Sequence, residues 1–250
     1  EQSLKHPAMF PSMLVERLIN SLTTKNQDIV LDPFLGSGST LIAARRLGKR
    51  GIGCELSSEY LSLFKQRLSQ NSFWDEEEDN LRILQGDARE ELQGVEPNSV
   101  DITITSPPYW DILNRKRTAD YKEIRHYGNN DGDLGIIPSY HAFLGEVGKV
   151  FREVHRAMKP NSYCVIVVMD LRKKDKFFPF HCDIARMMDG LGFIYDDMII
   201  WNRQSEYNNL RPLGYPYVFR VNKVHEFVLI FKTRKEGDKS KIDQGLPFEA

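Results

Sequence analysis

The chain has 250 residues, a mass of 29.0 kDa and a mean hydropathy of −0.44, which fits one sizeable α/β core. Hydrophobic residues make up 41% of the chain, but no apolar run approaches the length of a bilayer span, which argues against a membrane protein. The net charge of −1, from 34 Lys+Arg and 35 Asp+Glu, gives no overall signal for nucleic acid, so only local basic runs could provide one.

Three cysteines, Cys54, Cys164 and Cys182, show no CxxC spacing. This pattern argues against a disulfide framework and against a zinc site, and no metal is expected. It predicts a reducing, intracellular location, which in a prokaryote is the cytoplasm around the nucleoid.

The sequence alternates apolar strands with amphipathic helices, and neither an internal repeat nor a long low-complexity segment is present. We expect strands at residues 28–34, 51–56, 81–85, 99–106, 163–169, 193–201 and 225–232. We expect helices at residues 40–50, ending near Gly48, at 57–70, capped by Ser57, and at 140–158 and 181–191. This order predicts a doubly wound, mainly parallel sheet of seven strands, with the last two strands paired antiparallel at one edge.

A glycine-rich turn, LDPFLGSGST (residues 31–40), joins the first strand to the helix after it, where an open α/β sheet binds its ligand. A P-loop would need a lysine after Gly38, and a dinucleotide site would need a third glycine near Leu41, so both fit poorly. The third class is S-adenosylmethionine, whose methionine end can lie over Gly36 and Gly38 because neither residue carries a Cβ.

Two acidic residues follow at successive strand ends. Glu55 closes the second strand, where it can accept hydrogen bonds from both ribose hydroxyls of such a cofactor. Asp87 closes the third strand, where it can accept from the adenine amino group. Either residue alone could be a solvated carboxylate, but the pair after a glycine turn favours the cofactor.

The fourth strand runs into ITITSPPYWD (residues 102–111) and stops at two prolines, which cannot continue strand pairing but leave carbonyl oxygens free. A serine hydroxyl and two aromatic rings complete a corner that could hold a planar group carrying N–H donors. Taken by themselves, these residues are explained equally well by a simple turn.

Five segments, HPAMFP, DPFLGSGST, GIGCELS, GDA and TSPPYW, together resemble the motif set of the DNA amino-methyltransferases, which methylate N4 of cytosine or N6 of adenine. The resemblance runs from about His6 to Trp110 and continues more loosely through residues 199–232. Many members carry the SPP-aromatic motif first, so this chain resembles a circular permutation of them. The resemblance implies a Rossmann-like methyltransferase sheet, S-adenosyl-L-methionine as cofactor, double-stranded DNA as substrate and a cognate restriction endonuclease as a partner.

The resemblance also assigns residues within one methyltransferase domain covering residues 1–250. HPAMFP and the helix after it would pack beside the methionine end of the cofactor. The expected cofactor-binding residues are His6, Pro7, Phe10, Asp32, Pro33, Phe34, Gly36, Ser37, Gly38, Ser39, Thr40, Glu55, Leu56, Asp87 and Ala88. The expected catalytic residues are Ser106, Pro107, Pro108 and Tyr109. The expected contacts to the target base or DNA, in and near target-recognition loops at residues 111–137 and 202–222, are Trp110, Arg115, Lys116, Arg117, Trp201, Arg203 and Arg211.

An exocyclic amine is a poor nucleophile because its lone pair is delocalised into the ring. Ser106 Oγ and the Pro107 carbonyl are the expected acceptors for its N–H groups, and Tyr109 would stack on a base flipped out of the duplex. The absence of a Pro-Cys pair argues against methylation of cytosine C5. By resemblance, serine in the first position favours N4 of cytosine. An adenine-N6 enzyme, an RNA methyltransferase and a non-catalytic binding module remain as alternatives, and Trp201 is explained equally well as a core residue.

Overall fold

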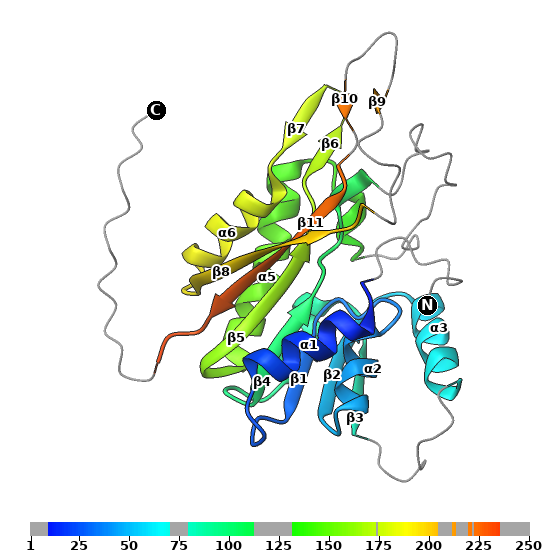
Figure 1. Cartoon of the computed structure of the whole chain (residues 1–250), viewed down its shortest axis with the longest axis vertical. Helices are drawn as coiled ribbons and strands as arrows, with labels where there is room; N and C mark the ends of the chain where they lie inside the picture. The colour runs from blue at the N-terminus through cyan, green and yellow to red at the C-terminus, as the bar shows by residue number, and fades with distance from the viewer. Residues whose placement is uncertain are drawn as a thin grey trace.

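The computed structural model describes residues 10–70, 80–112, 132–173, 175–204, 212–213, 220–221 and 223–235. Its centre is a seven-stranded sheet with the strand order β3-β2-β1-β4-β5-β11-β8 (Figure 1). In that order the strands span Leu81–Gln85, Arg50–Glu55, Ile29–Asp32, Val100–Thr105, Met158–Val168, His225–Lys232 and Ile194–Asn202. The first five strands are parallel, whereas β11 is antiparallel to both β5 and β8. The predicted sheet and its antiparallel edge pair are confirmed.

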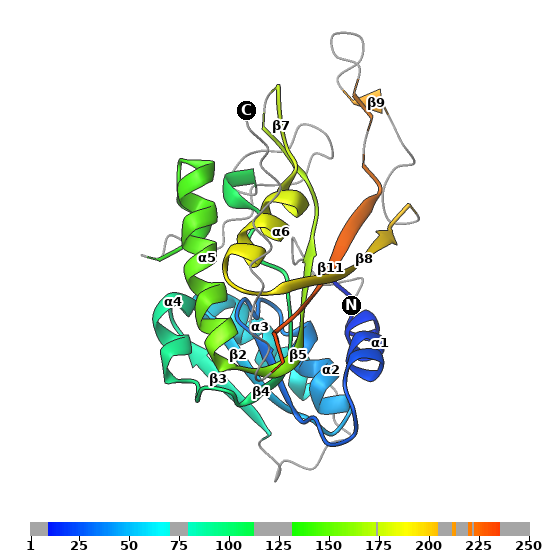
Figure 2. The same ribbon diagram turned by 90° about the vertical axis from the view of Figure 1, so that its left-hand side faces the viewer.

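Helices cover both faces of the sheet, and Figure 2 shows α5 and α6 on one side with α1 and α2 on the other. The helices are α1 (Ser12–Leu22), α2 (Ser39–Arg46), α3 (Ser58–Ser69), α4 (Ala88–Glu91), α5 (Tyr140–Ala157) and α6 (Phe180–Gly190). Short 3-10 turns occupy η1 (Leu92–Gly94), η2 (Trp110–Ile112) and η3 (Leu134–Ile136). None of the helices in the described segments combines the length and apolar character needed to cross a bilayer.

The middle of the sheet is buried on both faces. Val165 and Val167 of β5 join the apolar cluster under α1 and α2, while Cys164 and Ile166 join the cluster under α5 and α6. Successive strand residues point to opposite faces, so a strand covered on both sides reads as a continuous apolar run. This explains why YCVIVVM was recognisable in the sequence.

Two predicted boundaries differ from the structure. α2 ends at Arg46, shortly before the predicted end near Gly48, and Arg50 begins β2 by pairing with Ile29, one residue before the predicted start of that strand. Gly48 adopts the left-handed conformation, with a φ of +67°, and so ends the helix before β2. β5 begins at Met158, earlier than predicted, because Met158 pairs with Val100 before an irregularity shifts the register.

Two small hairpins were not predicted. β6 (Leu171–Lys173) pairs antiparallel with β7 (Lys176–Phe178), directly after β5. β9 (Pro212–Leu213) pairs with β10 (Arg220–Val221), within the connection from β8 to β11. Each strand has only two or three residues, too few for a visible period-2 pattern.

Gly38 is the residue at which α2 depends on glycine. Its φ is +81°, and a Cβ added there would lie 2.0 Å from Cδ2 of Phe64 on α3. We expect Gly38→Ala to lower the free energy of unfolding by about 2–5 kcal/mol, the sum of left-handed backbone strain and overpacking. Urea denaturation measures this loss.

Gly48→Ala is the matched control. Gly48 also has a positive φ of +67°, but an added Cβ meets no atom within 4 Å, so only the strain of about 1–2 kcal/mol applies. Equal losses in the two variants would contradict the role given to the Gly38–Phe64 contact.

Candidate active site

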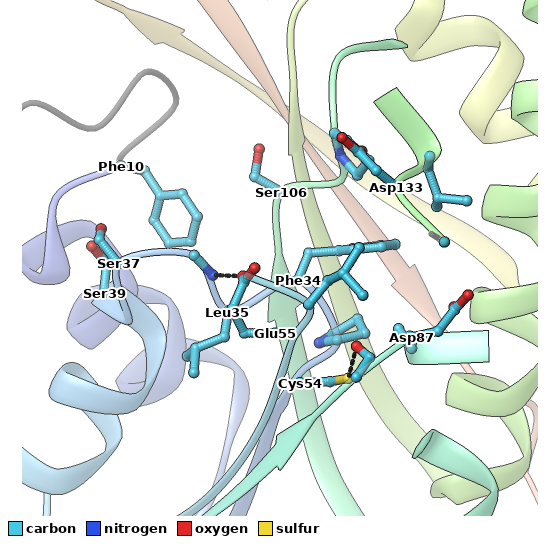
Figure 3. Close-up of a pocket in the computed structure, with 18 residues that line it drawn as sticks. Phe10, Phe34, Leu35, Ser37, Ser39, Cys54, Glu55, Asp87, Ser106 and Asp133 are labelled. Carbon is cyan, nitrogen blue, oxygen red and sulfur yellow. Dashed lines mark hydrogen bonds between the residues drawn. The ribbon is translucent and has the colours of Figure 1, made fainter. Parts of the chain in front are cut away.

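A pocket lies at the carboxyl ends of β1, β2, β3 and β4 (Figure 3). It encloses about 860 Å³, part of which is open to solvent. Its lining residues are Phe10, Pro33, Phe34, Leu35, Gly36, Ser37, Ser39, Cys54, Glu55, Leu56, Gly86, Asp87, Ala88, Ser106, Pro108, Gly132, Asp133 and Leu134. Both the glycine-rich turn and the SPPY corner therefore open into one cavity.

The glycine-rich turn is fixed from two sides. Glu55 Oε2 accepts a hydrogen bond of 2.7 Å from the Gly36 amide, which joins the end of β2 to the turn after β1. On the other side, the buried guanidinium of Arg67 on α3 donates to the Ser37 carbonyl at 2.6 Å and to Ser37 Oγ at 3.0 Å. The turn is thus tied to β2 on one side and to α3 on the other.

Glu55 is the central carboxylate of the pocket. Its Oε1 accepts from the Ser57 amide at 2.8 Å, so both carboxylate oxygens have backbone partners. Burial raises the pKa of Glu55 to about 7, although these backbone hydrogen bonds oppose the shift.

Asp87 stands across the pocket and is held by Arg89. It caps α4 by accepting from the Arg89 amide at 2.9 Å, and both carboxylate oxygens also accept from the Arg89 guanidinium. That guanidinium also pairs with Glu146 of α5 at 2.5 Å. Burial alone would raise the pKa of Asp87, but the hydrogen bonds from Arg89 outweigh burial and leave the pKa below its ordinary value.

Asp32 lies behind the pocket and not on its wall. It is 2% exposed, and its Oδ1 accepts from Thr105 Oγ1 at 2.6 Å and from the Phe34 amide at 3.1 Å. Burial raises the pKa of Asp32 to about 6, against the effect of these hydrogen bonds. Asp32 therefore links the end of β1 to the end of β4.

The SPPY corner follows directly after β4. Ser106 and Pro108 line the pocket, and the Tyr109 hydroxyl lies 3.3 Å from Ser106 Oγ. The Tyr109 ring is 3% exposed and meets Phe180 of α6 edge-on, with the ring centroids 6.4 Å apart. Tyr109 thus positions the serine hydroxyl from behind.

Trp110 lies in the core, although it was predicted to contact the base or DNA. Its indole N–H donates to the Ile137 carbonyl at 2.7 Å, and its ring meets Tyr140 and Phe178 edge-on. The Lys173 ammonium lies 3.7 Å from the ring centroid. With only 4% of its surface exposed, Trp110 could reach DNA only by leaving this cluster.

Trp201 and Arg203 lie away from the pocket lining. Trp201 is partly buried against the cluster under α1 and α2, which agrees with its reading as a core residue. The Arg203 guanidinium lies 4.6 Å from the Trp201 ring centroid and pairs with the Glu226 carboxylate. Both residues have protein partners within the described part of the chain.

The other predicted site residues divide into three sets. Ten of the predicted cofactor residues line the pocket: Phe10, Pro33, Phe34, Gly36, Ser37, Ser39, Glu55, Leu56, Asp87 and Ala88. Asp32, Gly38, Thr40, Pro107 and Tyr109 support it without lining it, with Thr40 Oγ1 donating to the Ile104 carbonyl at 3.2 Å. His6, Pro7, Arg115, Lys116, Arg117 and Arg211 lie outside the described residues.

Sequence reasoning missed six lining residues: Leu35, Cys54, Gly86, Gly132, Asp133 and Leu134. Gly132, Asp133 and Leu134 come from the connection before α5, where no strand or helix pattern indicated a place near the pocket. The one available signal was local: Asp133 Oδ1 accepts from the Gly135 amide at 2.7 Å, as aspartates do at turns.

With this geometry in place, comparison with known proteins identifies the chain. The family described as DNA methylase, N6_N4_Mtase, matches residues 1–66 and 100–245, most of the sequence. The chain belongs to this family. Both the glycine-rich turn and the SPPY corner fall within the matched ranges.

Individual relatives match smaller parts of the chain. Type II methyltransferase M2.DpnII of Streptococcus pneumoniae is 48% identical over 64 residues, which are 26% of this chain and 24% of that protein. Type II methyltransferase M.MjaI of Methanocaldococcus jannaschii is 27% identical over 177 residues, 62% of this chain and 56% of that protein. The chain therefore spans about a quarter and about half of the length of these two relatives.

A solved structure of a SAM-dependent methyltransferase from Methanosarcina mazei shares the fold. Its TM-score is 0.54 at 13% identity, covering 87% of this chain and 97% of that chain. At this identity the likeness concerns the fold alone.

The hydrogen bond between Thr105 and Asp32 gives a prediction with a defined pH dependence. The bond favours the charged carboxylate, so Thr105→Val raises the pKa of Asp32 above about 6. We expect the variant to lose about 1–3 kcal/mol of unfolding free energy at pH 8 and less at pH 5, where Asp32 is mostly protonated. Urea denaturation at both pH values measures the difference.

Thr103→Val is the control on the same strand. Thr103 Oγ1 is buried and has no hydrogen-bond partner among the described residues, so its loss should not destabilise the protein at either pH. A loss in Thr105→Val that is equal at pH 5 and pH 8 would contradict the coupling to Asp32.

Proposed function

We propose that this DNA methylase transfers a methyl group from S-adenosylmethionine to the exocyclic N4 of cytosine in DNA. One observation carries the proposal: Gly36 and Glu55 of the cofactor segments line the same pocket as Ser106 and Pro108 of the catalytic corner. A methyl donor and an amine held in one pocket lie within the short reach that in-line attack requires. We also propose that residues 1–250 form a single catalytic domain, and that a cognate restriction endonuclease is its partner in the cell.

The pocket residues fit the proposed cofactor. The Glu55 carboxylate lines the pocket at the end of β2 and suits two adjacent ribose hydroxyls as a hydrogen-bond acceptor. Asp87 remains charged beside Arg89 and suits the adenine amino group. Phe10 and Leu56 add apolar lining for the flat ring. When bound, the cofactor supplies a methyl group activated on a sulfonium.

The catalytic corner fits an amine. Ser106 Oγ and the Pro107 carbonyl would accept the two N–H groups, which localises the nitrogen lone pair and stabilises the positive charge that develops during attack. The Tyr109 hydroxyl, 3.3 Å from Ser106 Oγ, holds the serine in position. A base inside a duplex cannot reach this pocket, so it must be flipped out to bring its amine to Ser106, which the Tyr109 hydroxyl positions from behind the pocket lining.

Serine at position 106 supports cytosine over adenine, by resemblance to family members with SPPY. Nucleoside analysis tests the proposal: the protein is incubated with isotope-labelled S-adenosylmethionine and genomic DNA, and the nucleosides are identified by mass spectrometry. We expect labelled N4-methylcytosine. N6-methyladenine alone would refute the choice of base, whereas labelling of RNA but not of duplex DNA would refute the choice of polymer.

Ser106→Ala separates catalysis from binding in the same assay. Loss of one acceptor for the developing charge should lower turnover about 10²- to 10³-fold while cofactor affinity stays unchanged. The control is Ser62→Ala. Ser62 is an exposed residue of α3 whose hydroxyl donates to the Ser58 carbonyl, so the variant should keep full turnover. Wild-type cofactor binding without transfer to any nucleic acid would instead support a non-catalytic module.

The raised pKa of Glu55 predicts how cofactor binding depends on pH. With a pKa of about 7, Glu55 is mostly neutral at pH 6 and mostly charged at pH 8, and the charged form is the better acceptor for ribose hydroxyls. We expect the affinity for S-adenosylmethionine to rise between these pH values, as measured by isothermal titration calorimetry. Glu55→Gln should bind about tenfold more weakly and lose that part of the rise.

Glu55→Gln also serves as the control for other groups that titrate between pH 6 and pH 8, including those of the cofactor. These groups contribute equally to the pH dependence of affinity in both proteins. Identical pH profiles for wild type and Glu55→Gln would contradict the role given to the carboxylate.

A further inference from the structure

The β6–β7 hairpin extends past the end of β5, on the side of the sheet where the catalytic corner lies (Figures 1 and 2). Its pairs are Leu171 with Phe178, Arg172 with Phe177, and Lys173 with Lys176. Because strand residues alternate in direction, Arg172 and Phe177 share one face of the ribbon, and the other two pairs share the opposite face.

The inner face is fixed to the catalytic corner. Leu171 and Phe178 are buried, and Phe178 packs edge-on against Trp110 with ring centroids 5.2 Å apart. The Lys173 ammonium lies over the same indole and pairs with the Asp111 carboxylate at 2.6 Å. Trp110 and Asp111 directly follow the SPPY segment, so the hairpin has a defined position relative to the proposed site of methyl transfer.

The outer face carries an exposed aromatic ring between two cations. Phe177 is 40% exposed, which is unusual for a ring of this size. The Arg172 guanidinium lies 5.3 Å from its centroid, and the Lys223 ammonium, which comes from the segment before β11, lies 4.3 Å from it. Two segments far apart in the sequence thus bring two positive charges to one exposed ring.

These two cations have no carboxylate partner among the described residues. Arg172 donates to the Asp175 carbonyl at 3.3 Å, and Lys223 donates to the Asp170 carbonyl at 3.0 Å. The Asp170 carboxylate is engaged by His181 Nδ1 at 2.5 Å. Burial lowers the pKa of Lys223 to about 8; Asp170 opposes this shift, and Arg172 adds to it. Neither cation forms a salt bridge among the described residues, so both the ammonium and the guanidinium group can pair with an anionic ligand.

We propose that the outer face of the β6–β7 hairpin binds the sugar-phosphate backbone of DNA, with Arg172 and Lys223 pairing phosphates and Phe177 packing against the sugar or base between them. The inference rests on the proposed function, because it takes DNA as the substrate. Cations and an exposed ring are the combination that tracks a nucleic-acid strand without reading its sequence. The anchor at Lys173 keeps this contact beside the catalytic corner.

Salt dependence of DNA binding tests the proposal. The affinity of the full chain for a fluorescein-labelled 20-base-pair duplex is measured by fluorescence anisotropy over a series of NaCl concentrations. In the double variant Arg172→Gln/Lys223→Gln, the slope of log affinity against log salt should fall by about 1.8, which is about 0.9 for each lost phosphate contact. Phe177→Ala should weaken binding about tenfold with an unchanged slope, because it removes packing and no charge.

Arg152→Gln is the control for loss of charge. Arg152 is exposed on α5, towards the end that leads into β5 and away from the hairpin, so its slope should equal that of wild type. The single variant Arg172→Gln, at an exposed position of the outer face, serves if the double variant fails to fold, and its slope should fall by about 0.9, the value for one phosphate contact.

Unchanged slopes in both hairpin variants, with an unchanged affinity in Phe177→Ala, would overturn the proposal. Tighter binding of an RNA of the same length by wild type, with the loss in the variants confined to RNA, would overturn the choice of DNA. Methyl transfer by wild type is assayed separately. If wild type methylates DNA but the hairpin variants keep the wild-type salt slope, only the hairpin proposal is refuted. If wild type transfers no methyl group but the variants show the reduced slope, only the proposed function is refuted.

Discussion

The hydrogen bond from Thr105 Oγ1 to Asp32 Oδ1 is the interaction on which the site depends most directly. Asp32 ends β1 and begins the glycine-rich turn, while Thr105 ends β4 and precedes Ser106. One half of the pocket follows β1 and the other follows its neighbour β4. The two halves are therefore joined through a single buried carboxylate. Because Asp32 also accepts from the Phe34 amide, the same oxygen sets the start of the turn.

Further contacts fix each half of the pocket to the elements around it. Glu55 ties the turn to β2, Arg67 ties it to α3, and Phe64 closes on Gly38. On the far side, Arg89 joins Asp87 to α5 through Glu146. Side chains from several elements thus fix the two halves of the pocket relative to each other.

The sequence predicted the parts of the fold and site whose signal is local. Continuous apolar runs identify strands buried on both faces, and Gly36, Glu55 and Asp87 stand at strand ends where the order of elements alone brings them together. The parts it did not predict depend on tertiary contacts. Trp110 was predicted to contact the base or DNA because it follows SPPY directly, but Ile137, Tyr140 and Phe178 bury it. Asp133 reaches the pocket only because of the path the chain takes before α5.

The antiparallel strand β11 has a consequence for how this scaffold can vary. His225 at the start of β11 pairs with Asn202 at the end of β8, so the two ends of the intervening connection are fixed side by side at the edge that bears the pocket. The entropy of closing such a loop rises only slowly with its length, by about 0.6 kcal/mol for each doubling. Segments of very different size can therefore be exchanged here without altering the sheet, so this connection can change in length while the pocket at the other strands stays intact.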